Sequence, residues 1–331
     1  MPDALDLSAL AGTATDYARD NKDHIFSKAL APGVSGLPGT PVKPLDEYVM
    51  SIPGNDEVVL TELVMGSVVQ PSQYNGFTPK NNVFKIKPRK AKVKPCKVDL
   101  KFTQEKIMAL WKTYYGQIKG GKINKEEVLF EQFIMNDVIK RIQTDLRNAY
   151  VNGVRNDAGT SPLDTMDGLF KIYQSEIASG GVPAANIATI AAITEANAVG
   201  QFEKIIDTLP TEYFYQDLVC LTPLAHLKAY ERNYRKEYGT LPYNAGFQKQ
   251  TIEGTVIEFL VEPYMLTTGL TAFEAPLILP RNIIAWLYDD ESAQSNLTFD
   301  YNVRERDLAW VMDFQVGMDV AMPGLIWSGQ V

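Results

Sequence analysis

The sequence is poor in the residues and runs that mark several large classes of protein. It contains only two cysteines, Cys96 and Cys220, and only two histidines, His24 and His226. Two cysteines allow at most one disulfide bond, which excludes a disulfide-stapled fold and fits a reducing compartment. No run approaches the roughly 18 apolar residues that suggest a membrane-spanning helix. The first residues, MPDALDLSALAG, lack a basic region followed by an apolar core, so we expect no secretory signal there.

The sequence also lacks the common catalytic motifs. There is no GxSxG, HExxH, Walker or CxxC pattern, and no GxGxxG follows a predicted strand. We expect His226 on the solvated side of a helix and Cys220 in a buried strand, where a thiol is inert. Asp157, Asp164 and Asp167 lack the regular alternation of a calcium loop, so a solvated turn is favoured over a cation site. The sequence therefore predicts a protein that is not an enzyme, with no catalytic residue, metal or cofactor.

Charge is distributed unevenly along the chain. The net charge of −8 argues against a nucleic-acid-binding protein held by bulk charge. Between Lys80 and Lys106, however, ten basic residues stand against Asp99 and Glu105, so this window carries +8 and the remainder carries −16. A basic segment on one copy can dock on the acidic body of another. This distribution is a first indication of self-assembly.

Residues 1–53 are predicted to form an extended arm. Seven proline and glycine residues lie between Pro32 and Pro44, a density that prevents a regular helix or a central strand. Two interpretations remain open. The segment is either a disordered tail or an arm anchored on a partner through its apolar residues, which are Leu30, Val34, Leu37 and Leu45.

A long hairpin is predicted from two strand-like runs, 57–70 and 83–102, with turn-rich PSQYNGFTPKNN between them. Pro88 and Pro95 cannot donate to a ladder, which places the second strand at an edge, and its basic residues discourage uncontrolled edge pairing. A nucleic-acid tether is less favoured, because interleaved aromatic residues and glycines are missing. The candidate inter-subunit contacts are Lys85, Lys87, Arg89, Lys90, Lys92, Lys94 and Lys97.

A long amphipathic helix is predicted after a shorter one at 103–115. Asn124 and Glu127 form a capping-box pattern, and Asn152-Gly153 provides a stop. About 28 residues at about 1.5 Å each give a length on the order of 40 Å. The apolar residues at helical spacing are Met135, Val138, Ile142, Leu146 and Ala149. The polar side is expected to face solvent: Glu131, Asn136, Lys140, Arg141, Asp145 and Arg147.

The remainder alternates between predicted helices and strands. Helices are expected at 193–209 and 223–238, the second with Thr222 as N-cap and Gly239 as its stop. Strands are expected at 218–221, 255–261 and 283–288. The strongest strand covers 310–322, where apolar residues alternate with Asp313, Gln315 and Asp319. The fold class is therefore α+β.

This order of elements resembles the Hong Kong ninety-seven capsid fold of tailed-phage major capsid proteins and encapsulins. Its most specific pieces are DLVCLTPLAHLKAYERNYRKEYG followed by TIEGTVIEFLVEP, and the closing VMDFQVGMDVAMPGLIWSG. The resemblance implies an N-terminal arm at 1–53 and an extended loop at 54–102. It implies a peripheral domain at 103–155 and 265–331, with a spine helix at 125–152, and an axial domain at 156–264. No long scaffold-like segment leads the chain, so a separate scaffold or prior processing is expected.

The resemblance also implies a function. The chain would be a structural subunit whose hexamers and pentamers close an icosahedral shell around the double-stranded DNA genome of a bacteriophage. Portal, scaffolding, and decoration or cargo proteins would be partners, packaged DNA would be contacted non-specifically, and no membrane would be involved. The protein would be assembled in the host cytoplasm and reside in the virion. An encapsulin-type shell, a tail or baseplate protein, and an oligomeric metabolic enzyme remain as alternatives.

Overall fold

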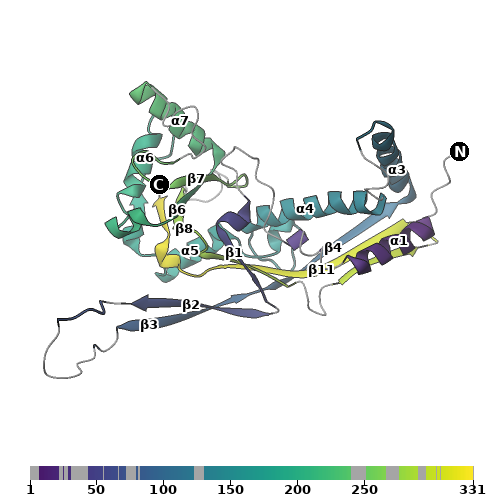
Figure 1. The fold of residues 1–331 in the computed structure, drawn as a ribbon, viewed down its shortest axis with the longest axis horizontal. Helices are drawn as coiled ribbons and strands as arrows, with labels where there is room; N and C mark the ends of the chain where they lie inside the picture. Colours follow the sequence, from purple (N-terminus) through teal and green to yellow (C-terminus); the bar gives the residue numbers. More distant parts are fainter. Residues whose placement is uncertain are drawn as a thin grey trace.

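Two five-stranded sheets and a separate two-stranded ribbon organise the described part of the chain. The computed structural model describes residues 7–21, 25, 29–30, 44–54, 56–65, 67–71, 80, 83–122, 130–239, 251–265, 276–289, 296–302, 304–305 and 307–330. Figure 1 shows the ribbon extending away from the body, on the side opposite to α1 and α3. Within these ranges, no helix combines the length and apolarity needed to cross a membrane.

The first sheet is built around one long strand. Its order is β1-β9-β11-β10, and β4 pairs with the other edge of β11. The strands are β1 (Val49–Pro53), β4 (Lys94–Thr103), β9 (Ile284–Asp289), β10 (Asn296–Asn302) and β11 (Asp307–Val320). The predicted alternation of β11 is confirmed, since Trp310, Phe314 and Val316 are buried on one face. Gln315 and Asp319, on the other face, are also largely buried.

Three helices pack along this sheet (Figure 1): α1 (Leu7–Asp20), α3 (Gln104–Lys119) and α4 (Phe130–Asn152). The long predicted helix is confirmed over the 23 residues of α4, and Met135, Ile142 and Leu146 lie in the core. The proposed caps Asn124 and Glu127 fall outside the described residues.

The predicted N-terminal arm contains a helix that sequence reasoning missed. Helix α1 precedes the proline-rich stretch and packs against β10. Two of the four proposed anchors are buried, Leu30 and Leu45, and the indole nitrogen of Trp286 donates a hydrogen bond of 3.0 Å to the Leu30 carbonyl. The other two, Val34 and Leu37, lie outside the described residues. This part of the chain is therefore anchored on its own subunit.

The predicted hairpin is real but shorter than expected. In the ribbon, β2 (Glu57–Met65) pairs with β3 (Phe84–Lys92), from Glu57↔Lys92 to Met65↔Phe84. The second predicted strand, 83–102, is divided at Val93, whose amide bonds to the Asp56 carbonyl at 3.1 Å and closes the ribbon. Its second half is β4, which pairs with β11 instead. Both halves lie at edges, as the prolines predicted.

The second sheet has the order β5-β12-β8-β6-β7. Its strands are β5 (Ile187–Thr189), β6 (Leu218–Thr222), β7 (Glu258–Val261), β8 (Leu277–Pro280) and β12 (Trp327–Gln330). Helices α6 (Ala198–Ile206) and α7 (Leu224–Tyr238) belong to this half, whereas α5 (Leu169–Ser179) contacts β11 of the first sheet and shares a hydrogen bond between Tyr173 and Ser328 with β12. β8 and β12 both come from residues 265–331, so this segment contributes strands to both sheets. Residue 264 is therefore not a boundary between the two sheets.

Helix α7 begins one residue later than predicted and faces differently. Its N-cap is Pro223 rather than Thr222, and Gly239 ends it in the left-handed conformation at φ 68°. His226 was expected on the solvated side but is only 3% exposed. It lies in the first turn of α7, on the face that also buries Leu227 and Tyr230. The expectation of a surface histidine was therefore wrong.

Candidate inter-subunit surface

The ribbon projects from the body without a further strand partner among the described residues. Apolar side chains remain exposed along it, with Val59 53% and Ile86 58% accessible. An isolated two-stranded ribbon is marginally stable in water and gains stability when its faces are covered. The described residues of the body therefore leave these apolar positions of the ribbon uncovered.

The basic residues of the ribbon are partly neutralised by acidic residues of the same ribbon. Lys90 lies 2.6 Å and Lys92 3.5 Å from Glu57, and Lys87 lies 3.6 Å from Glu62. The hydrogen bond from Lys90 lowers the pKa of the Glu57 carboxyl. β3 carries five basic residues and β2 carries two acidic ones, so the paired strands keep a formal charge of +3. The ribbon remains basic, though less so than the sequence window implied.

The seven candidate contact residues do not share one surface. Lys85, Lys87, Lys90 and Lys92 lie on the ribbon, whereas Arg89 turns toward the body and pairs with Asp319 and Glu176. Lys94 and Lys97 belong to β4, and Lys97 pairs with the neighbouring Asp99 at 2.6 Å. Within the described residues, Lys85 and Lys94 have no ion-pair partner.

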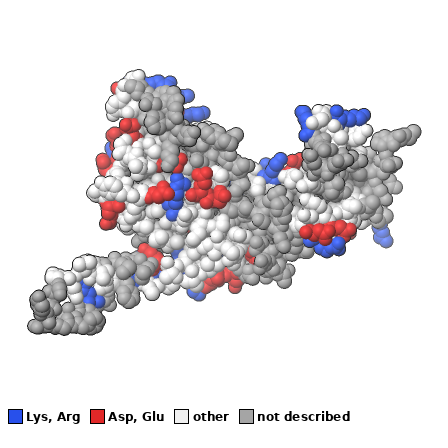
Figure 2. Space-filling model, in the orientation of Figure 1, with Lys and Arg blue, Asp and Glu red and all other residues white. Residues whose placement is uncertain are grey.

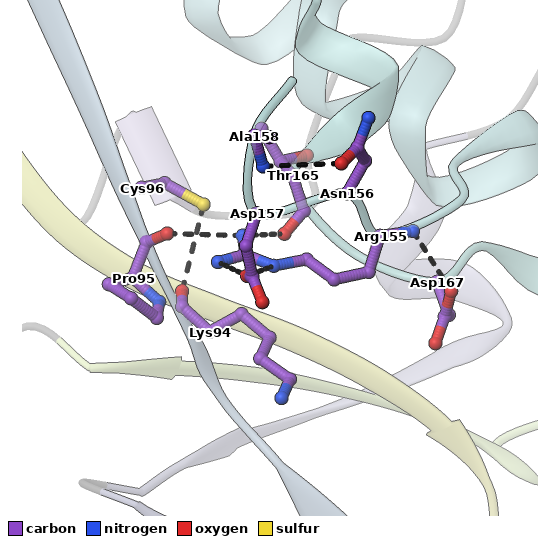
Figure 3. Close-up of polar contacts among 9 residues, drawn as sticks. All are labelled: Lys94, Pro95, Cys96, Arg155, Asn156, Asp157, Ala158, Thr165 and Asp167. Carbon is purple, nitrogen blue, oxygen red and sulfur yellow. Dashed lines mark hydrogen bonds and ion pairs between the residues drawn. The ribbon is translucent and has the colours of Figure 1, made fainter. Parts of the chain in front are cut away.

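Arg155 fastens the loop between α4 and α5 to the start of β4 (Figure 3). Its guanidinium donates to the carbonyls of Thr165 at 2.7 Å and Pro95 at 3.3 Å, and to the Asp157 carboxylate at 2.7 Å. Its amide donates to Asp167 at 3.0 Å.

The acidic residues of this loop are used in its own hydrogen bonds, as a turn would use them. Asp164 accepts from the Ser161 amide at 2.8 Å and completes a capping box. No cluster of three His, Cys, Asp or Glu side chains suited to a metal occurs among the described residues.

Two adjoining cavities lie beside β4. One, of about 430 Å³, lies between α4 and β4 and is mostly apolar, with Val98, Leu100 and Val138 in its wall. The other, of about 570 Å³, is more polar and lies beside Arg155. Cys96 and Phe314 border both. Sequence reasoning could not place these spaces, because it assigned β4 to the hairpin.

A buried ion pair joins α4 to the segment after β7, and sequence reasoning missed it. Arg147 donates to Glu262 through Nε at 3.0 and 3.2 Å and through Nη2 at 2.9 Å, and the side chains are 1% and 3% exposed. The Tyr48 hydroxyl donates to the same carboxylate at 3.1 Å. Burial raises the pKa of Tyr48, which keeps this phenol protonated as a donor.

The prediction that Arg147 faces solvent is therefore wrong. The end of α4 is covered on more than one side, since the Asn152 side chain also donates to the Tyr264 carbonyl at 2.7 Å. The consecutive apolar residues Ala149, Tyr150 and Val151 were the available signal for this wider burial.

The charged residues visible on one face of the molecule are grouped. Figure 2 shows Lys and Arg gathered over α3 and α7 and present on the ribbon, with Asp and Glu spread over the body between them. On this face, basic and acidic residues are thus largely separated.

The sequence matches no protein-family profile and no curated protein, but the structure resembles solved shells. A chain of the satellite phage P4 procapsid superposes with a TM-score of 0.55 at 16% identity, covering 85% of this chain and 92% of that chain. The SrpI encapsulin of Synechococcus elongatus PCC 7942 gives 0.52 at 10% identity, covering 85% and 84%. A capsid chain of an empty GTA particle gives 0.50 at 10% identity, covering 90% and 98%. The chain therefore has the Hong Kong ninety-seven capsid fold.

Proposed function

We propose that this chain is the major capsid protein of a tailed bacteriophage, a structural subunit that closes into a shell around the genome. The observation that carries the proposal is a projecting ribbon without a strand partner among the described residues, on a body with the fold of procapsid and GTA capsid chains. The proposed role is mechanical, since the function of the chain is to form contacts with other copies of itself. Obligate interfaces of this kind commonly bury more than about 2,000 Å².

The structural units suggest an assignment of segments to the domains of a capsid subunit. We assign residues 1–53 to an N-terminal arm and 54–92 to the extended loop that reaches a neighbour. The first sheet with α3 and α4 is assigned to the peripheral domain, and the second sheet with α5, α6 and α7 to the axial domain. Residues 265–331 are divided between the two, because β8 and β12 pair in the second sheet.

The assembly would consist of hexamers and pentamers of this chain. Portal, scaffolding and decoration proteins are the expected partners, and packaged DNA is contacted without sequence preference. The protein is assigned to the virion, with assembly in the host cytoplasm. An encapsulin-type shell with an enzyme cargo is the second candidate, supported by the encapsulin superposition, whose TM-score of 0.52 is close to that of the procapsid chain.

Sedimentation and electron microscopy of the purified protein test the proposal. We expect closed shells and species far above the 36.9 kDa monomer, and a monomer at every salt concentration would contradict it. Particles recovered from infected or induced cells separate the two candidates, since a capsid contains DNA and an encapsulin contains a protein cargo.

Charge reversal tests the ribbon. Lys85→Glu together with Lys87→Glu is expected to abolish shell formation while the far-UV spectrum of the subunit is unchanged. The matched control is the pair Lys112→Glu and Lys119→Glu on α3, which changes the charge equally at a site away from the ribbon. Equal shell yields from the ribbon variant and the unaltered protein would show that these lysines only solvate the ribbon.

A further inference from the structure

The root of the ribbon is packed against the first sheet on one side. Leu60, Ala91 and Val93 are buried in a small apolar cluster with Ala285 and Leu287 of β9. β11 crosses the root closely at Gly317, where a Cβ would come within 2.3 Å of the Lys92 carbonyl oxygen. The ribbon is therefore joined to the first sheet by a closely packed contact at Lys92–Val93.

Beside this packed cluster, the root is open toward α5. A crevice of about 270 Å³ separates the ribbon from α5, with Lys90, Lys92, Ser175 and Met318 among its walls. Close packing is missing across this space, so apolar contacts alone do not determine the angle between the ribbon and the body.

Arg89 reaches from the ribbon to two carboxylates of the body at this crevice. Its Nη2 lies 2.6 Å and its Nε 2.8 Å from Asp319 of β11, and its Nη1 lies 2.8 Å from Glu176 of α5. The three side chains are 26%, 12% and 16% exposed. Partial burial strengthens such pairs, and a planar guanidinium can bind two carboxylates in fixed directions.

We propose that Arg89 is a latch that sets the direction in which the ribbon leaves the body. Asp319 and Glu176 belong to two different elements, so a ribbon that pivots at Lys92–Val93 cannot keep both bonds. Arg89 thus differs in role from the exposed lysines beside it: it positions the ribbon, and the lysines face outward. This inference rests on the proposed function, in which the ribbon must meet a neighbouring copy.

The direction of the ribbon can be measured on dissociated subunits, before any assembly. Spin labels at Thr61 on the ribbon and Lys204 on α6 report the distance between ribbon and body by pulsed electron paramagnetic resonance. We expect one narrow distance distribution in the unaltered protein. Arg89→Met is expected to broaden or shift it, and Arg89→Lys to do so partly, because an ammonium lacks the planar fork. Lys87→Met on the same strand is the matched control and should leave the distribution unchanged.

Glu176→Gln provides a second variant that leaves the ribbon sequence intact and removes one of the two carboxylates. It is expected to broaden the distribution as well. A narrow, unshifted distance distribution in both Arg89→Met and Glu176→Gln would overturn the latch, independently of the size and yield of the shells. Shell assembly is then scored separately. A broadened distribution with shells of unaltered size and yield would support the latch and contradict the proposed contact between the ribbon and a neighbour.

Discussion

Replacing Glu262 by glutamine is expected to destabilise the subunit by about 3–5 kcal/mol, because it removes the negative partner of a buried cation. Three hydrogen bonds between Arg147 and Glu262, of 2.9 to 3.2 Å, join side chains that are 1% and 3% exposed. Glutamine has nearly the same shape but only one acceptor oxygen, and it leaves the guanidinium charge without compensation. The loss is a large share of a typical stability of about 5–15 kcal/mol.

The assay is a urea titration of dissociated subunits, followed by tryptophan fluorescence. With a slope of about 3 kcal/mol per molar, the midpoint should fall by on the order of 1 M. Arg141→Met is the matched control on the same helix: its pair with Asp145 is exposed, with side-chain accessibilities of 72% and 30%. Such surface pairs contribute about 0–1 kcal/mol.

The double variant Arg147→Met with Glu262→Leu separates the loss of the pair from the isolation of a charge. It should recover part of the stability, because no buried charge is left unpaired, although the Tyr48 hydroxyl loses its acceptor at a cost of about 1–3 kcal/mol. A midpoint for Glu262→Gln that falls no further than that of Arg141→Met would refute the argument that this ion pair is desolvated.

Two further outcomes are expected. Phe314→Ala should lower the unfolding midpoint of the dissociated subunit by the equivalent of about 3 kcal/mol. This is the lower end of the range for a buried phenylalanine, because cavities already border this ring, which is 4% exposed. An unchanged midpoint would mean that the ring packs only in the shell. Burial raises the pKa of the Cys96 thiol to about 11, so roughly one molecule in a thousand holds the thiolate at pH 8. Alkylation by iodoacetamide should therefore be slow at pH 8 and accelerate up to about pH 11, and a rate at pH 8 equal to that of a free thiol would contradict the burial.

Local patterns predicted the elements whose surroundings are uniform along their length. The alternation in β11 and the helical spacing of Met135, Ile142 and Leu146 follow from one buried face, and the structure confirms both. The division at Val93 was not predictable in the same way. The residues on either side of it alternate alike, and only the distant strand β11 draws the second half into the sheet.

The buried polar residues were missed for the same physical reason. Arg141 and Arg147 are both polar positions on α4, and only the apolar run at 149–151 beside Arg147 distinguishes them locally. Arg147 is buried because Glu262 and Tyr48, from remote parts of the chain, meet it there. His226 was misplaced because it lies on the face of α7 that also buries Leu227 and Tyr230, which the helix packs against the core. For the candidate contact residues, the hairpin position of Lys85, Lys87, Lys90 and Lys92 was predictable. The position of Lys94 and Lys97 was not, because β4 pairs with β11. The pairing of the ribbon lysines with Glu57 and Glu62 depended on the register of β2 and β3.

The chain passes from β3 to β4 through the single residue Val93, and Figure 1 shows the two strands following nearly one line across the molecule. A neighbour that pulls on the ribbon therefore pulls along the axis of β4. Such a force loads the ten register positions between β4 and β11 together, in shear, because ladder hydrogen bonds lie across the strands. A sideways force would instead peel them apart one after another. The chain is thus expected to resist a pull along the line of β3 and β4 best, and a force that lifts the ribbon out of that line least.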